Sequence, residues 1–151
     1  MKKMHRVLVV AAGLGVATLA GTASAQFSKA EDAVKYRQSG FTVIANHMGR
    51  LAAMAKGEQA FNAEAAKVSA NLINDTMKHQ WAAFPSGSDG DGAKLKADPW
   101  KRADEFKKLQ EKSMAETAKL TESTGSLDTL RPQVGATGAS CKACHDEFRK
   151  I

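Results

Sequence analysis

The sequence predicts an all-α protein, folded as an antiparallel up-down-up-down four-helix bundle. In four segments of about 20 residues, apolar residues recur every three or four positions, which is the period of an amphipathic helix. No stretch alternates apolar and polar residues for long enough to form a half-buried strand. Among the 151 residues there are only three prolines, and 6% are aromatic, which is too few for an all-β sandwich. Two short links and one long loop join the four segments, as in a bundle of antiparallel neighbours.

Residues 1–25 are expected to form a secretory signal peptide. Three basic residues stand among the first six, residues 7–19 are apolar, and residues 23–25 (Ala-Ser-Ala) resemble a cleavage site. The alternative is a membrane anchor, but residues 7–19 are short for the roughly 20 apolar residues of a spanning helix. We therefore expect one domain at residues 26–151, located in the periplasm and not inserted in the membrane after cleavage.

The charge pattern argues against nucleic-acid binding. The leader holds three of the 22 basic residues and none of the 16 acidic ones, so the formal net charge falls from +6 to about +3 without it. The remaining basic residues are interleaved with acidic ones, as in residues 104–108 (Asp-Glu-Phe-Lys-Lys). This pattern is typical of solvated helix faces and not of a phosphate-binding stripe.

The first helix is expected to begin at a capping box formed by Ser28 and Glu31 and to end near Gly57. Arg37 is the one charged position on its otherwise apolar stripe. That stripe contains Ala30, Ala33, Val34, Phe41, Ile44, Met48 and Leu51.

The later elements are indicated by capping residues and breakers. Asn62 is a favourable N-cap for a second helix, which Pro85 stops. After the loop at residues 85–97, Asp98 and Pro99 predict the cap and the first position of a third helix. The third helix is expected to end at Gly125. A fourth helix is expected to begin between residues 127 and 132 and to run to the C-terminus.

The fourth segment carries a Cys-x-x-Cys-His run, formed by Cys141, Cys144 and His145, which is the attachment sequence of c-type haem. Positions i, i+3 and i+4 share one face of a helix, so both sulfurs and the imidazole point into the bundle together. The thiols can add to the two vinyl groups of the porphyrin, while His145 binds iron as the proximal ligand. We therefore expect one covalently bound haem c per chain.

Two other interpretations of this run are weaker. A thioredoxin-like thiol–disulfide oxidoreductase places its Cys-x-x-Cys after a strand, and no strand is expected here. A closed zinc site would need a further pair of Cys or His ligands nearby. A sixth iron ligand would have to come from upstream of the run. The candidates, none of which the pattern singles out, are His47, Met48, Met54, Met77, His79 and Met114.

Four stretches of the chain together resemble the cytochrome c′ family, the class II c-type cytochromes. They are residues 31–38 (Glu-Asp-Ala-Val-Lys-Tyr-Arg-Gln), 47–50 (His-Met-Gly-Arg), 81–84 (Trp-Ala-Ala-Phe) and 138–145, which end in the attachment run. The resemblance implies a left-handed four-helix bundle that pairs as a homodimer through its first two helices. It also implies a haem with five-coordinate, high-spin iron.

The resemblance assigns roles to further residues. Arg37 and Gln38 match haem-contact positions, and a guanidinium there can meet a haem propionate. Phe41 matches the apolar residue that covers the open face of iron, with Ile44, Trp81 and Phe84 walling the same pocket. Arg149 matches a basic residue beside the proximal imidazole. Ser88 and Asp89 fall in the loop that makes further contacts with the haem edge.

These residues favour a haem protein that transfers one electron or binds nitric oxide and carbon monoxide, and not an enzyme. An apolar pocket offers bound dioxygen no hydrogen bond and offers peroxide cleavage no general acid or base. The alternative is a low-spin, six-coordinate electron carrier of the cytochrome c-556 type, with an upstream methionine on iron. The redox partner is not identified by the sequence.

Overall fold

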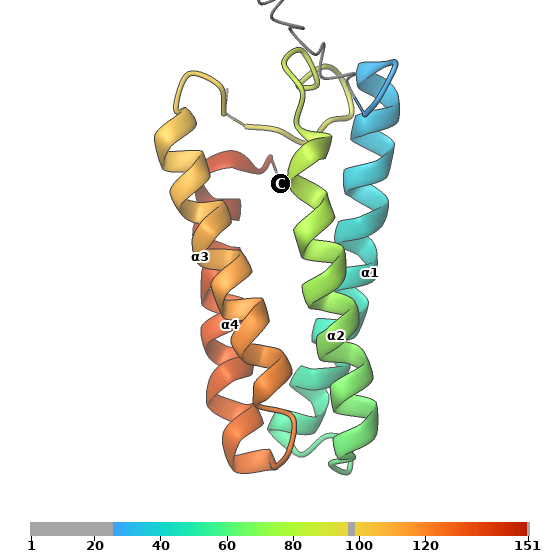
Figure 1. Cartoon of the computed structure of the whole chain (residues 1–151), viewed down its shortest axis with the longest axis vertical. Coiled ribbons are helices and arrows are strands. Elements are labelled where there is room, and N and C mark those ends of the chain that lie inside the picture. The colour runs from blue at the N-terminus through green and yellow to red at the C-terminus, as the bar shows by residue number, and fades with distance from the viewer. Residues whose placement is uncertain (1–25, 97–98, 151) are drawn as a thin grey trace, which may run out of the picture.

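The computed structural model describes residues 26–96 and 99–150. Its four α-helices form an antiparallel bundle, which confirms the expected fold class (Figure 1). The long loop and the C-terminus lie at the same end of the bundle. The expected signal peptide lies outside the described residues. The elements, in chain order, are α1 (Ala30–Lys56), α2 (Ala63–Gln80), the short 3-10 helix η1 (Trp81–Ala83), α3 (Ala103–Glu122) and α4 (Leu127–Phe148).

The start of α1 differs from the expected capping box. Lys29 occupies the N-cap position and makes no side-chain cap, so the predicted pairing of Ser28 with Glu31 is wrong. The carbonyl of Lys29 already accepts from the amides of Asp32 and Ala33, which places Ser28 one residue too early to cap. The expected end of α1 is confirmed, because Gly57 adopts the left-handed conformation with φ 80°.

Side-chain caps begin the second and fourth helices. The Oδ1 atom of Asn62 accepts from the amide of Ala65 at 2.8 Å, as the sequence predicts for α2. Ser126 caps α4 by accepting from the amide of Thr129 at 3.2 Å. After α2, the chain continues through η1 to Phe84 before Pro85 breaks it.

The predicted start of α3 at Asp98 and Pro99 is wrong. Asp98 lies outside the described residues, residues 99–102 form a turn, and the helix begins at Ala103. The indole Nε1 of Trp100 donates to the carbonyl of Phe84 at 2.9 Å, which ties this turn to the end of η1. A tertiary contact thus overrides the local helix-start signal. The helix ends at Glu122, shortly before the expected Gly125.

The half of the bundle away from the loop is a packed apolar core. Leu51, Ile73, Leu120 and Leu130 come from the four helices in turn, and each is fully buried. These buried side chains stabilise this end of the bundle, while the loop end is left to form a site.

Within residues 26–96 and 99–150, no helix is long and apolar enough to cross a membrane.

We expect Leu120→Ala to lower the free energy of unfolding by about 2–5 kcal/mol, because it leaves a cavity in this core. The exposed Lys108→Ala on the same helix should change it by less than about 0.5 kcal/mol. Chemical denaturation of the two variants measures both values. Equal stability of the two variants would contradict the placement of the core.

Candidate functional site

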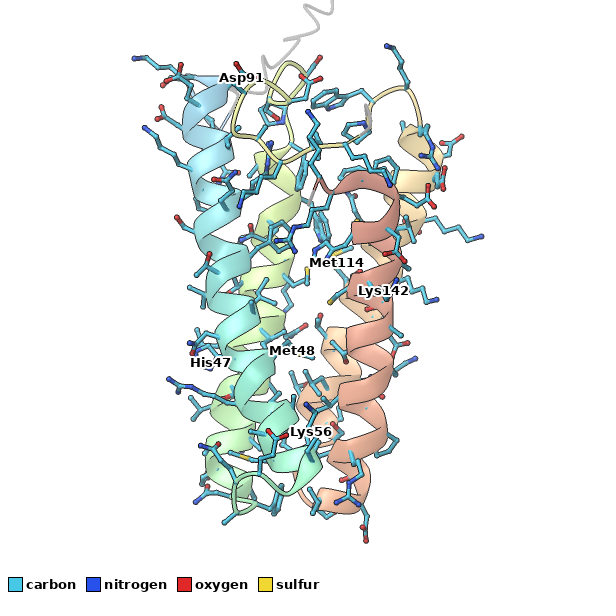
Figure 2. The ribbon with its side chains drawn as sticks, turned by 180° about the vertical axis from the view of Figure 1, so that it is seen from behind. His47, Met48, Lys56, Asp91, Met114 and Lys142 are labelled. Atoms are coloured by element: carbon cyan, nitrogen blue, oxygen red, sulfur yellow. The ribbon has the colours of Figure 1, made fainter. Side chains whose placement is uncertain are left out.

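A cavity of about 660 Å³ lies at the loop end of the bundle, and all four helices contribute to its walls. Figure 2 shows Met48 between the helices, whereas His47 lies on the outer side of α1. His47 hydrogen-bonds Ser69 through Nδ1 at 3.2 Å, so it does not reach the cavity. Of the methionines considered as upstream ligands, Met48 and Met77 line the cavity.

One wall of the cavity is formed by α4. Cys141, Cys144 and His145 all line it, as their spacing on one helix face predicts. Gly138, one turn earlier, lines the same wall and leaves space because it has no side chain. Two thiols and one imidazole therefore face the same cavity.

The electrostatics of this wall favour uncharged side chains. Burial raises the pKa of the Cys144 thiol to about 11 and also raises the pKa of the Cys141 thiol. Burial, followed by the charge of Arg149, lowers the pKa of His145, while Asp146 acts in the opposite direction. At neutral pH the imidazole is therefore neutral and can offer a nitrogen lone pair to a metal. A thiol–disulfide oxidoreductase needs a lowered thiol pKa, so these raised values argue against that alternative.

The opposite wall is aromatic and comes from α1 and the end of α2. The Phe41 ring meets the rings of Trp81 and Phe84 edge-on, with centroids 6.4 and 6.5 Å apart. The centroid of Phe41 also lies 6.4 Å from that of the His145 imidazole. Phe41 is thus the α1 side chain that faces His145, and phenylalanine has no atom that can coordinate a metal.

Arg37 is only 2% exposed, and its guanidinium fastens the loop to α1. It donates to the carbonyl of Ala83 at 3.0 Å, to Oγ of Ser88 at 2.8 Å and to the carbonyls of Ser88 and Ala93. The guanidinium also lies over the ring of Phe84, 4.8 Å from its centroid. Burial lowers the pKa of Arg37, and the charge of Asp89 acts against this shift.

The neighbouring site residues fall into two groups. Gln38 lines the cavity and donates from Nε2 to the carbonyl of Gly92 at 2.6 Å, so it also holds the loop. Ser88 is buried beneath Arg37, Asp89 is exposed, and neither lines the cavity. In this structure Ser88 and Asp89 act on the site through Arg37.

Arg149 lines the cavity beside the imidazole, and the backbone around it pairs with the loop. The amide of Lys96 donates to the carbonyl of Phe148 at 2.8 Å, and the amide of Lys150 donates to the carbonyl of Lys94 at 2.9 Å. Sequence reasoning missed this short antiparallel pairing. The one available signal was Leu95, an isolated apolar residue in a polar loop, which is buried here.

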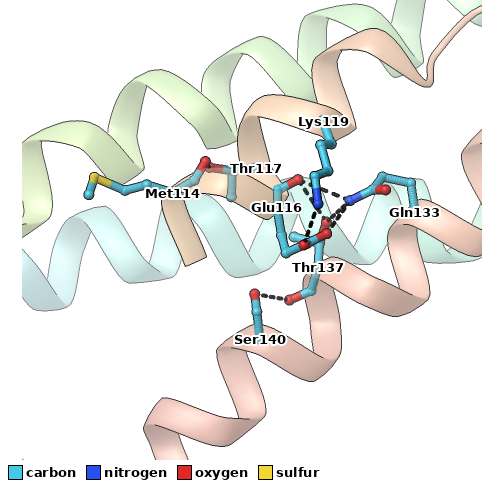
Figure 3. A network of polar contacts seen from close by, with 7 residues as sticks. All are labelled: Met114, Glu116, Thr117, Lys119, Gln133, Thr137 and Ser140. Carbon is cyan, nitrogen blue, oxygen red and sulfur yellow. Dashed lines mark hydrogen bonds and ion pairs between the residues drawn. The ribbon is translucent and has the colours of Figure 1, made fainter. Parts of the chain in front are cut away.

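A polar network that sequence reasoning also missed ties α3 to α4 below the site (Figure 3). Gln133 donates from Nε2 to the carbonyl of Glu116 at 3.1 Å and to its carboxylate at 2.8 Å. The hydroxyl of Thr137, one turn before Cys141, donates to the same carbonyl at 3.3 Å. Lys119 and Gln133 lower the pKa of Glu116 by hydrogen bonding to its carboxylate. This network holds α4 in register with α3.

Comparisons with known proteins agree with this arrangement. The family model described as "Cytochrome C'" matches residues 32–149. Cytochrome c′ of Rubrivivax gelatinosus is 42% identical over 128 residues, covering 83% of this chain and 99% of the relative. Its crystal structure has a TM-score of 0.79 at 41% identity, covering 83% of this chain and 100% of that one.

Solved structures of engineered variants of Alcaligenes xylosoxidans cytochrome c′ are also similar. One is a nitric oxide complex, with a TM-score of 0.78 at 39% identity, covering 83% of this chain and 99% of that one. Another is a variant with carbon monoxide bound, also with a TM-score of 0.78 at 39% identity, covering 83% of this chain and 100% of that one.

We expect Arg37→Met to release the loop, because it removes every hydrogen bond from the guanidinium while keeping an unbranched side chain. The free energy of unfolding should fall by about 2–4 kcal/mol, and the amides of residues 84–96 should exchange hydrogen faster. Ser88→Ala removes one acceptor and should cost about 1 kcal/mol. Hydrogen-exchange mass spectrometry checks the loop, and unchanged exchange in Arg37→Met would contradict its role as a tether.

Proposed function

The chain belongs to the cytochrome c′ family, whose cofactor is haem c, and we propose that Cys141 and Cys144 attach this haem while His145 binds its iron. The observation that carries the proposal is the α4 wall, where two thiols and an imidazole face one cavity. Burial raises the pKa of both thiols and lowers the pKa of the imidazole, which favours their uncharged forms. Thiols suit thioether formation, and a neutral imidazole suits iron. The apolar rings opposite suit a porphyrin face, so the residues present fit the group.

The function we propose is one-electron transfer, binding of nitric oxide and carbon monoxide, or both. When bound, haem c supplies a one-electron couple and an iron that can take a diatomic ligand. Phe41 lies beside His145 and has no atom that can coordinate iron, which favours five-coordinate, high-spin iron. The nitric oxide and carbon monoxide complexes of related cytochromes c′ support the same binding here.

The cavity walls suit the binding of a cofactor and a small ligand. Among the described residues, the cavity is lined by no carboxylate and by no histidine other than His145. An enzyme that cleaves peroxide or hydrolyses a substrate needs a positioned acid or base beside the reacting atoms. The chain's own groups therefore bind, orient and shield the cofactor.

The roles of the remaining site residues follow from their contacts. Arg37 and Gln38 line the cavity at the loop end, where a buried cation suits a haem propionate. Arg149 places a positive charge beside His145 and opposes protonation of the imidazole. Ser88 accepts hydrogen bonds from the Arg37 guanidinium, and the negative charge of Asp89 favours its charged form.

We further propose a periplasmic homodimer that pairs through α1 and α2. The large apolar side chains that are exposed in the described part of the chain, Tyr36, Val43, Val68 and Leu72, all belong to these two helices. Burial of such side chains between two copies would be favourable. The periplasmic location rests on the leader at residues 1–25 and on the need of a haem-attached chain to be exported.

A double variant, Cys141→Ser with Cys144→Ser, should lose all covalently bound haem when it is produced with the haem-attachment machinery. The wild-type chain should give a haem-stained band after denaturing electrophoresis, because thioether bonds survive denaturation. A stained band of equal intensity in the double variant would contradict attachment through these cysteines.

Phe41→Ala should speed carbon monoxide binding to the ferrous protein at least tenfold, because the ring that faces His145 is removed. Phe61→Ala, which removes an aromatic ring at the link between α1 and α2, is the control and should leave the rate within twofold of wild type. Flash photolysis or stopped-flow mixing measures both rates. An unchanged rate in Phe41→Ala would contradict the role of Phe41 as a steric gate.

A further inference from the structure

Gly40 in α1 and Gln80 at the end of α2 touch at the point where the two helices approach the site. A Cβ atom added at Gly40 would lie 1.9 Å from Nε2 of Gln80 and 2.6 Å from its Cδ. Both distances are far below van der Waals contact, so no other residue type fits at position 40 while Gln80 keeps its place. The glycine therefore allows the Gln80 amide to pack directly on the α1 backbone.

Hydrogen bonding does not account for the position of the Gln80 amide. The side chain is 1% exposed, and its Nε2 makes one long contact, 3.5 Å, with the carbonyl of Thr76. Its Oε1 atom is buried without a hydrogen-bond partner in the described part of the chain. A buried, unpaired carbonyl is destabilising, and an apolar side chain of the same length would avoid this cost. What the amide contributes here is its shape.

Each half of this contact directly precedes a residue of the aromatic wall. Phe41 follows Gly40 in α1, and Trp81 follows Gln80 at the junction of α2 with η1. The rings of Phe41 and Trp81 meet edge-on, with centroids 6.4 Å apart. The Gln80 amide is the end of a flexible side chain, but the side chain is 1% exposed and has little room to turn away. Its packing on the α1 backbone therefore influences how α1 and α2 approach each other beside the two rings.

We propose that the Gly40–Gln80 contact is a positioning device that holds the Phe41 and Trp81 rings at the separation that restricts access to the cavity from their side. This inference rests on the proposed function, since it takes these rings as the wall above the open face of iron. Neither Gly40 nor Gln80 lines the cavity, so both residues act through the rings that follow them.

The first test compares two glycine-to-alanine substitutions on α1 in the haem-loaded protein. Gly40→Ala displaces the buried Gln80 amide and so disturbs the packing of α1 on α2 beside Phe41, which should raise the carbon monoxide association rate at least fivefold. Gly49→Ala is the matched control, because a Cβ atom there meets nothing within 4 Å, and its rate should stay within twofold of wild type. Near-ultraviolet circular dichroism of the ferric protein should change for Gly40→Ala alone, because the packing of the aromatic rings changes.

The second test removes the other half of the contact. Adding Gln80→Ala to Gly40→Ala relieves the clash and should return the rate to within twofold of wild type. Gln80→Ala alone leaves a void beside Gly40, the residue that precedes Phe41, and should raise the rate at least threefold. Gln80→Met keeps the length of the side chain, so its rate should stay within twofold while its thermal unfolding midpoint rises. The Gln80 variants decide the matter if Gly40→Ala does not fold.

The outcomes separate this inference from the proposed function. If Phe41→Ala speeds binding but Gly40→Ala and Gln80→Ala do not, the positioning role is overturned and the gate stands. If Phe41→Ala also has no effect, the assignment of the aromatic wall itself fails. A change in Gly49→Ala as large as that in Gly40→Ala, or a changed rate in Gln80→Met, would also overturn the positioning role.

Discussion

Cys141, Cys144 and His145 share one face of α4, and this shared face determines where a site can form in the bundle. This face of α4 forms one wall of the cavity at the loop end of the bundle. The opposite end compensates with the fully buried leucine and isoleucine side chains of its core. Hydrogen bonds from Gln133 and Thr137 to the carbonyl of Glu116 tie α4 to α3 just before the attachment run. One end of the bundle is thus a packed core, and the other end contains the cavity.

The loop after η1 closes the hollow end through contacts to two helices. Arg37 on α1 binds the carbonyls of Ala83, Ser88 and Ala93, and the loop at Lys94 and Lys96 pairs with the last residues of the chain. The loop consists mostly of small polar residues, which offer little apolar packing. Hydrogen bonds from the Arg37 guanidinium and between the two backbone segments hold it in place. The same residue lines the cavity, so Arg37 organises the loop and also forms part of the cavity wall.

Helical periodicity and the Cys-x-x-Cys-His run predicted the fold class and the α4 wall, because both depend on spacing along one helix. The capping box at Ser28 was wrong because the first backbone hydrogen bonds of α1 go to the carbonyl of Lys29, one residue later. The start of α3 at Pro99 was wrong because a tertiary hydrogen bond from Trp100 to Phe84 ties that segment into a turn. The partners of Arg37, the pairing of Leu95 with Arg149 and the Gly40–Gln80 contact join residues about 40 to 55 positions apart. No local pattern encodes such contacts, because they arise only when the helices pack.

The absorption spectrum of the ferrous protein, with and without carbon monoxide, shows whether the iron has a free coordination position. With Phe41 and not a methionine facing His145, the account predicts a five-coordinate, high-spin spectrum that carbon monoxide converts to a six-coordinate, low-spin one. A low-spin spectrum before carbon monoxide is added would contradict the account, because it would require a protein ligand such as Met48 on the side that Phe41 covers.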